Sequence, residues 1–529
     1  MKRRQFIKLS AMSSVLLAAP IPLHSQPVRR GINLDPRDPR GFSNPLLLPG
    51  RDGILGVLEP QAPFSIQAKA GSAEILPGKK TGLLVYEVDV GRKTFINPIL
   101  RVRQGAQLTA RLSNQLSEDT IIHWHGLLVD GKNDGVPTDA IAAGQEYQYD
   151  FTVRNRAGTY WYHPHPFERT SAQAYFGQAS FFLVEDDDER RLRHALDLQL
   201  GLTEIPIVIQ DKSFDDSGNL MYEPTDDEWF MGFLGDTILA NLTVKPVLNV
   251  APRIYRFRLL NGSNARIYRL AFVRGSTRTP FHIIGTDGGL LAQPLPTDEV
   301  FLAPGERVDV LLDLGRCRPG EQLFLKSLAF DPMDNEEMTD GMTTEPAMGL
   351  ANGEEFYILK LNVSRQMMRH HSSIPSELST IAPINLSGAV TRPVVLSAGN
   401  EPETAMQWFI NGWRYNPAEV PLQVQRNTVE IWEIMNEMES MPHPMHIHGF
   451  QFQVLERVGS PPQVAVLAGA NGLLPTDTGW KDTILTWPGE TVRIAIDFTH
   501  PYAGEQFYVF HCHNLEHEDM GMMINYRVV

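Results

Sequence analysis

The chain has 529 residues, of which 42% are hydrophobic and 21% charged, and its formal net charge is -15. One compact domain seldom reaches this length, so two to four domains are expected. The negative charge argues against nucleic acid as a partner, and the 42 Gly and 38 Pro favour turns and strands over long helices.

The first residues resemble an export signal. A basic segment at residues 2–8 precedes an apolar run at 11–23, which is too short to span a membrane as a helix. Because Arg3 and Arg4 stand together, the segment resembles a twin-arginine signal, and we assign residues 1–25 to a signal peptide with cleavage near Ser25. The mature protein is then expected to be periplasmic or otherwise exported, without a membrane anchor.

Two strand patterns recur three times in the same order. The first is an alternating strand that ends in a polar turn, with copies at Val102–Leu116, Val250–Ser263 and Val424–Met438. The second begins at a turn of small residues, with copies at Ala143–Val153, Pro304–Leu314 and Pro488–Phe498. Apolar and polar residues alternate in every copy, which is typical of half-buried strands. The three ordered copies predict an all-β chain of three homologous β-sandwich domains.

Two segments between these copies lack the strand pattern. Glu185–Leu196 is highly charged and suits an exposed connector, and Ser364–Gly388 is rich in Ser and Pro and suits a second linker. The expected domains are therefore residues 40–190, 200–363 and 385–529.

Ten of the 16 histidines fall into four short clusters. A single His-x-His motif is weak evidence of a metal site, but here two clusters lie in the first expected domain, two in the third and none in the second. A random scatter of surface histidines would not have this distribution. The clusters are His123 and His125; His163 and His165; His443, His446 and His448; and His511, His513 and His517.

One of only two cysteines, Cys512, lies between His511 and His513. In an extended segment the two imidazoles point to one side and the thiol to the other. A thiolate with two imidazoles and a weak thioether is the ligand set of a blue copper site, and Cys512, His517 and Met522 supply three of its members. His443 is the natural fourth. The other eight histidines form an all-imidazole site that suits a copper cluster, whereas a structural zinc site closes with four ligands.

Four motifs, "HWHG", "HPHP", "HPMHIHG" and "HCHNLEHEDMGM", carry a family resemblance. In this order they resemble the copper motifs of the three-domain multicopper oxidases, which include laccases and bacterial cuprous oxidases. "YRFRLLNGSNAR" and "GTDGGLL" resemble the middle domain of the family. The resemblance implies three cupredoxin-like Greek-key β-sandwich domains, with the type 1 copper in the third.

The resemblance also implies a role for each ligand and four copper ions in all. It assigns His443, Cys512, His517 and Met522 to type 1 copper, His123 and His446 to type 2, and His125, His163, His165, His448, His511 and His513 to the type 3 pair. Electrons from a reductant would pass singly through Cys512 to the cluster, where dioxygen becomes water. Asp134 and Glu518 match family carboxylates that supply protons. Phe167 and Glu168 depart from the His-Gly that often follows "HPHP", and neither replaced position is a copper ligand.

The reductant is less well defined. Glu439 and Met441 match positions where bacterial cuprous oxidases hold Cu(I), and Asp519 could add charge there. The acidic segment Asp331–Met348 carries four thioethers that suit either a copper-capturing lid or a surface loop, namely Met333, Met338, Met342 and Met348.

We therefore expect a monomeric metallo-oxidase that oxidises Cu(I), or Fe(II), with laccase-like activity on phenols. One alternative is a general laccase acting on phenols and aromatic amines. The other is a copper-free scaffold of the same fold, which the complete set of ligands argues against.

Overall fold

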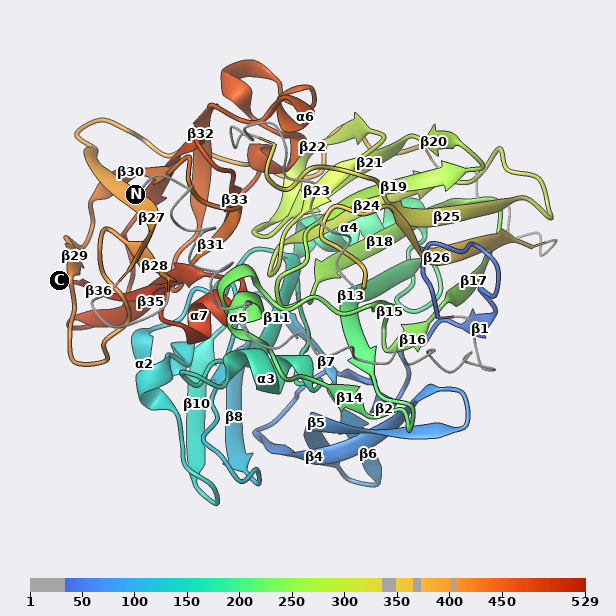
Figure 1. Ribbon diagram of the computed structural model, residues 1–529, viewed down its shortest axis with the longest axis horizontal. Helices are drawn as coiled ribbons and strands as arrows, with labels where there is room; N and C mark the ends of the chain where they lie inside the picture. Colours follow the sequence, from blue (N-terminus) through green and yellow to red (C-terminus); the bar gives the residue numbers. More distant parts are fainter. Residues whose placement is uncertain (1–33, 335–348, 365–372, 401–405) are drawn as a thin grey trace, which may run out of the picture. The chain divides into compact units, whose positions relative to one another are not determined.

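The computed structural model describes residues 34–334, 349–364, 373–400 and 406–529 (Figure 1). The predicted signal peptide and three predicted loop residues, Met338, Met342 and Met348, lie outside the described residues. All elements below belong to one compact unit, Asp35–Val529. Within the described ranges, no helix is both long and apolar enough to cross a membrane.

The described strands form six sheets, which pack in three pairs around three separate cores. In the first pair, one sheet has the order β10-β8-β4-β5-β6-β2 and the other β3-β7-β12-β11-β9. Apolar residues of both sheets meet in one core, for example Ile66 of β4 and Phe182 of β12. The strands are β2 Gly53–Ile54, β3 Val57–Leu58, β4 Phe64–Leu76, β5 Lys79–Val90, β6 Lys93–Ile96, β7 Ile99–Arg103, β8 Gln107–Asn114, β9 Ile122–His123, β10 Glu146–Thr152, β11 Gly158–Pro164 and β12 Ser180–Glu185.

The second pair of sheets occupies the middle of the sequence. Its sheets have the orders β1-β17-β26-β25-β19-β20, with β23 on β19, and β16-β15-β13-β18-β24-β21-β22, with β14 on β13. The strands are β1 Asn44–Pro45, β13 Glu204–Phe214, β14 Leu220–Met221, β15 Thr237–Ala240, β16 Thr243–Val244, β17 Pro246–Val250, β18 Ile254–Asn261, β19 Tyr268–Arg274, β20 Thr277–Thr279, β21 Phe281–Thr286, β22 Gly289–Thr297, β23 Val300–Leu302, β24 Arg307–Asp313, β25 Gln322–Ser327 and β26 Phe356–Val363.

The third pair of sheets includes the C-terminal strand. Its orders are β28-β27-β30-β34-β32 and β29-β36-β35-β31-β33. The strands are β27 Val390–Asn400, β28 Met406–Ile410, β29 Leu422–Val424, β30 Val429–Asn436, β31 His443–Ile447, β32 Phe452–Val458, β33 Thr483–Thr486, β34 Thr491–Asp497, β35 Gln506–Cys512 and β36 Met523–Val528.

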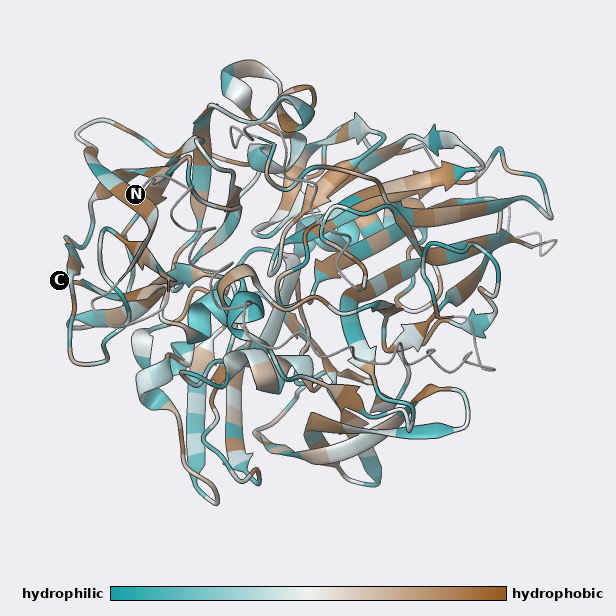
Figure 2. Ribbon diagram, viewed as in Figure 1, coloured by the Kyte–Doolittle hydropathy of each residue, from teal (hydrophilic) through white to brown (hydrophobic). Residues whose placement is uncertain are grey.

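The two recurring sequence patterns form equivalent strands in the three pairs. The first pattern folds as β8, β18 and β30, the second as β10, β24 and β34, and in each pair the two strands are antiparallel neighbours. On its other side the first-pattern strand has a parallel neighbour, β4, β13 or β27. The expected all-β fold of three cupredoxin-like sandwiches is thereby confirmed. Figure 2 shows the alternation behind it as hydrophobic and hydrophilic bands along the strands.

Helices are short and lie between strands. They are α2 Gly131–Asp134, α3 Thr170–Tyr175, α4 Asp187–Leu196, α5 Asp226–Met231, α6 Pro462–Ala465 and α7 Leu515–Asp519, with 3-10 turns η1 Pro137–Asp139, η2 Ala470–Gly472 and η3 Pro475–Thr478. Two of them, α5 and α7, contact each other beside the predicted type 1 ligands.

The predicted exposed connector at Glu185–Leu196 is wrong in part, because most of it is helix α4. Asp186 caps α4 by accepting a hydrogen bond from Glu189 N, and Leu192 and Leu196 are buried. The Glu189 side chain is also buried and accepts from Arg256 and Arg258 of β18. Strand β18 is consequently buried on both faces rather than half-buried, since α4 covers its charged face.

The boundaries 40–190, 200–363 and 385–529 remain our proposal for three domains. The three cores support it, because each draws almost all of its residues from one of these ranges. Strand β1 is an exception, since it falls in the first range but pairs with β17 of the second.

Candidate metal centre

Two strand pairings bring the four histidine clusters together. In the first pair of sheets His163 of β11 lies opposite His123 of β9, and in the third His446 of β31 lies opposite His511 of β35. The two sets then meet, because His123 Nε2 lies 3.3 Å from His446 Nε2 and His165 Nε2 lies 3.3 Å from His511 Nε2.

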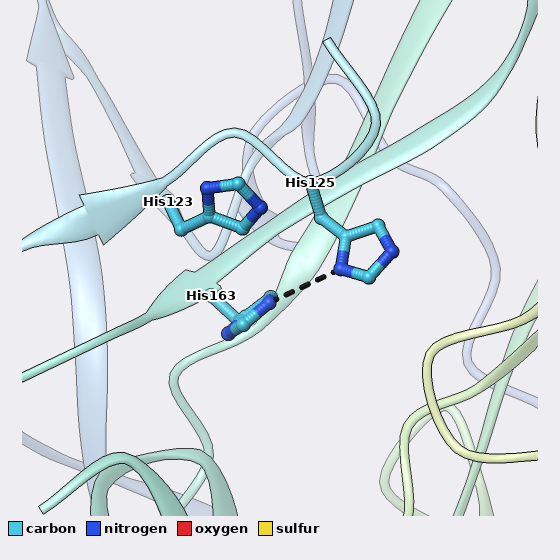
Figure 3. Close-up of side chains that lie close together, drawn as sticks. All are labelled: His123, His125 and His163. Carbon is cyan, nitrogen blue, oxygen red and sulfur yellow. Dashed lines mark hydrogen bonds between the residues drawn. The ribbon is translucent and has the colours of Figure 1, made fainter. Parts of the chain in front are cut away.

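The eight imidazoles fall into three groups of converging ring nitrogens. His123 and His446 form the first group. In the second, His448 Nε2 and His165 Nε2 lie 3.1 and 3.3 Å from His511 Nε2. In the third, His125 Nδ1 lies 3.3 Å from His163 Nε2 (Figure 3), and the ring of His513 lies 4.9 Å from that of His125. The structure thus brings together the eight histidines that the sequence assigned to the type 2 ion and the type 3 pair, and their assignment to particular ions stays a prediction.

A second, separate cluster surrounds Cys512. Its Sγ lies 3.5 Å from His443 Nδ1 and 3.6 Å from His517 Nδ1, on the opposite side of the strand from His511 and His513. Met522 is fully buried in the same core as Cys512, and its carbonyl accepts from Cys512 N at 3.0 Å. The second ring nitrogen of each imidazole also has a partner. His443 Nε2 lies 3.1 Å from Ser440 Oγ, and His517 Nε2 lies 2.9 Å from the Phe230 carbonyl.

The chemistry of these donors fits bound copper. Burial lowers the pKa of His165 to about 4, and the pKa values of His163 and His517 to about 3, so these imidazoles are neutral ligands at neutral pH. Burial also raises the pKa of the Cys512 thiol, so a thiolate there calls for a cation beside it. One thiolate, imidazoles and a thioether form a copper-selecting set, and the separate all-imidazole cluster suits more copper.

Both predicted proton carriers contact the ligands. Asp134 is fully buried at the end of α2, and its Oδ2 lies 2.6 Å from His448 Nδ1 while its carbonyl lies 2.8 Å from His123 Nδ1. Burial, with Asp139 and Asp130 nearby, raises the pKa of Asp134 well above its usual value.

Glu518 lies on the other side of the cluster. Its Oε2 is 3.2 Å from His511 Nδ1 and its Oε1 is 3.5 Å from His165 Nε2. Burial opposes ionisation of Glu518, but His165, His511 and His513 hold its pKa well below the usual value. The pKa values of the two carboxyl groups beside the cluster are therefore shifted in opposite directions.

Sequence reasoning missed Asp482, a third carboxylate at the cluster. It is fully buried, its Oδ1 lies 3.0 Å from His125 Nε2, and its carbonyl lies 2.8 Å from His446 Nδ1. Arg307 of the middle pair of sheets donates to both of its oxygens. A charged Lys-Asp pair inside the apolar stretch "GWKDTILTW" was the available signal.

The predicted substrate residues are placed differently from one another. Met441 is buried in the core that holds Cys512, Met333 packs against that core, and Glu439 is exposed. Asp519 is buried and turned to helix α3, where its oxygens accept from Thr170 N, Ser171 N and Ser171 Oγ. The carboxylate of Asp519 is therefore occupied within the protein. Phe167 packs on Tyr415, and Glu168 is exposed.

Three cupredoxin-like sandwiches with a cysteine-histidine site and an imidazole cluster define a copper protein. Two family models, both described as multicopper oxidase, match residues 85–189 and 389–529. The chain is 32% identical over 464 residues to a multicopper oxidase of Staphylococcus haemolyticus, covering 87% of each chain. It therefore belongs to the multicopper oxidase family, whose members bind copper and use dioxygen and a reductant.

Other similarities extend along nearly the whole chain. The crystal structure of the McoA multicopper oxidase of Aquifex aeolicus matches with a TM-score of 0.80 and 42% identity, over 92% of this chain and 99% of that one. The chain is also 28% identical over 527 residues to the cell division protein FtsP of Xenorhabdus nematophila, covering 99% of this chain and 97% of that protein.

Proposed function

We propose that this protein holds four copper ions and couples the one-electron oxidation of Cu(I), or Fe(II), and also of phenols, to the reduction of dioxygen to water. The observation that carries the proposal is the arrangement around one strand end. Cys512 faces His443 and His517, whereas His511 and His513 on either side of it face six other imidazoles. Type 1 copper would supply electron uptake at the first cluster, and type 2 and type 3 copper four-electron oxygen reduction at the second.

The protein itself links the two clusters. His511 Nδ1 donates to the Cys512 carbonyl at 2.9 Å, so a covalent path and a hydrogen-bonded path both run from the thiol to one imidazole. Water formation consumes protons, and Asp134 and Glu518 lie on opposite sides of the cluster with pKa values shifted in opposite directions. We assign Asp134 as a proton-holding acid beside His448 and Glu518 as an ionised carboxylate that accepts protons from solvent.

The choice of Cu(I) rests on Met441 and Glu439. A buried thioether and an exposed carboxylate two residues apart lie just before His443, and Met333 packs against the same core. Soft thioethers select Cu(I), and a carboxylate adds charge for a cation. A general laccase that oxidises phenols and aromatic amines is the alternative, in which these residues have no role in substrate binding.

Substitution at these two positions distinguishes the alternatives. Met441→Leu and Glu439→Gln are expected to lower kcat/KM for Cu(I) by about tenfold and to leave kcat/KM for hydroquinone within about twofold. Met438→Leu, at a methionine that is 49% exposed, is the matched control. Equal losses for both reductants, or no loss for Cu(I), would contradict the metallo-oxidase assignment.

A copper-free scaffold is a second candidate because of the similarity to a cell division protein. All twelve predicted ligands are present here and buried, and the donor atoms of ten of them converge in groups of three or more, which favours the enzyme. The test is copper content together with the Cys512→Ser variant. About four copper ions per wild-type chain and loss of the blue absorption in the variant support the oxidase, and a chain that takes up no copper supports the scaffold.

We also propose that the mature protein is exported, to the periplasm or beyond, as a monomer. The basic start and apolar run at residues 2–23 support export. Detection of a shortened N-terminus in an exported fraction would test this proposal.

A further inference from the structure

Helix α5 of the middle pair of sheets is docked on the loop that carries type 1 ligands. Glu516 of α7 is buried, and its Oε1 accepts from Tyr222 Oη at 2.8 Å while its Oε2 accepts from Phe233 N at 3.1 Å. These two partners lie just before and just after α5 (Asp226–Met231). One buried carboxylate beside His517 therefore holds both ends of this helical segment.

The end of α5 approaches the type 1 loop as closely as a backbone allows. Gly232, which ends the helix, has φ +98°, a conformation that favours glycine. A Cβ at Gly232 would lie 2.3 Å from Ala265 Cβ and 2.6 Å from Asn514 Nδ2, which is too close for either atom. Any side chain at this position would have to displace α5 from the loop.

Phe230 of α5 contacts the histidines beside Cys512 in two ways, directly through its carbonyl and indirectly through the ring of Trp408. Its carbonyl accepts from both His517 Nε2, at 2.9 Å, and Trp408 Nε1, at 2.8 Å. Its ring stacks on Trp408 with centroids 4.5 Å apart and planes 9° apart. Trp408 in turn lies 4.6 Å from the ring of His443 and 5.3 Å from that of His517.

An organic reductant would transfer its electron at the edge of a ligating imidazole, because the rate of electron transfer falls steeply as the distance between donor and acceptor grows. At His517 that edge is closed by the Phe230 carbonyl, behind the stacked rings of Phe230 and Trp408. Among the residues that the structure describes, the edge of His443 contacts the small, buried Ser440 hydroxyl, next to exposed Glu439 and buried Met441, and the Trp408 ring lies 4.6 Å from the His443 ring. The two imidazole edges therefore differ in what covers them, the Phe230 carbonyl and its stacked aromatic pair at His517 and a small hydroxyl beside an exposed carboxylate at His443.

We propose that Phe230 and Trp408 form an aromatic cover that determines substrate size, keeping bulky aromatic reductants from His517. The inference rests on the proposed electron uptake at Cys512, and it adds that Phe230 of the middle domain, which supplies no predicted ligand, selects the reductant together with Trp408 of β28. Small reductants and metal ions are left with the His443 side.

The test compares two reductants of similar chemistry and different bulk, hydroquinone and di-tert-butylhydroquinone. In the copper-loaded Phe230→Ala variant, anaerobic bleaching of the blue absorption by the bulky compound is expected to accelerate by about tenfold or more, and by hydroquinone less than about threefold. Nitrophenol serves as a phenol that is not oxidised in this assay. Calorimetry should detect nitrophenol binding to the Phe230→Ala variant but not to the wild type. Gly232→Ala, which displaces α5 while keeping the ring, should act in the same direction.

Phe507→Ala is the matched control, because it removes a 46% exposed phenyl ring from β35. The proposed cover is contradicted if bleaching by both reductants accelerates equally, because α5 then affects the type 1 site without selecting reductants by size. It is also contradicted if neither reductant causes faster bleaching in variants whose blue absorption is unchanged. The size comparison uses phenols alone, so it stands even where Cu(I) proves a poor substrate and the metallo-oxidase proposal fails.

Discussion

Some single residues at the candidate metal centre contact more than one predicted copper ligand, and Asp482 is an example. Its carboxylate binds His125 while its carbonyl binds His446, so one residue orients ligands of two different copper groups. Such outer partners hold the ring orientation and tautomer of a ligating histidine, and their loss typically weakens metal binding by about 10- to 100-fold. The candidate ligands could be selected from the sequence, because four short histidine clusters recur in the order of known copper motifs. The partner of His125 lies 357 residues away, and its role depends on the assembled fold.

We predict that Asp482→Asn loses copper from the all-imidazole cluster and keeps the blue site. The amide cannot balance the buried charge of Arg307, and breaking such a pair costs about 3–5 kcal/mol. Asp477→Asn is the control, because Asp477 is a comparably buried partner of Arg457, and within the described part of the chain its carboxylate bonds Arg457 and Leu474 N rather than a predicted copper-ligating histidine. Both variants should lose stability in denaturant titration, but only Asp482→Asn should bind less copper. Full copper content in Asp482→Asn would show that His125 needs no such partner.

At the scale of elements, all six patterned strands form as predicted, but β18 and β24 are buried on both faces rather than half-buried. In the sequence, Arg256 and Arg258 of β18 alternate with apolar residues as the exposed face of a strand would. In the structure, α4 covers them and supplies Glu189 as their partner. Short-range alternation cannot reveal which polar face another element will cover. Glu204 of β13 joins the same buried network, since its Oε1 accepts from Arg258 Nε at 2.6 Å.

This network predicts a loss of stability in acid. Burial by itself raises the pKa of Glu204, but Arg258, Arg256 and Arg193 lower it to about 2. A carboxyl group with a lowered pKa in the folded state stabilises the fold above its unfolded pKa, near 4.5, and loses that contribution as pH falls toward 2. The contribution is about 3 kcal/mol. Glu204→Gln should therefore be less stable than wild type at neutral pH, and the difference should shrink on acidification. Parallel stability curves from pH about 6 to about 3 would contradict this account.

At the scale of the whole molecule, the all-imidazole cluster is shared by the first and third pairs of sheets, and the middle pair joins them. Arg307 of the middle pair donates from Nε to the Thr159 carbonyl of the first pair at 2.9 Å and from Nη1 to Asp482 at 2.8 Å. Lys481 Nζ, near the third pair, in turn binds Asp287 and Glu306 at 2.9 and 3.0 Å. Repeats in the sequence predicted three sandwiches, but not this junction, because its charges lie far apart in the chain.

Arg307→Leu should therefore separate the copper-binding sandwiches before any of them unfolds. It leaves Asp482 as an unpaired buried charge at the point where the three pairs meet, at a cost of about 3–5 kcal/mol. We expect thermal unfolding to begin earlier and release of copper from the all-imidazole cluster to precede loss of the blue absorption. Arg256→Leu is the control, since Arg256 is equally buried, and within the described ranges its side chain bonds Glu189 and Asp309 rather than His125 or Asp482. It should lose similar stability while copper release and unfolding coincide. If they coincide in Arg307→Leu as well, the junction at Arg307 does not hold the cluster together.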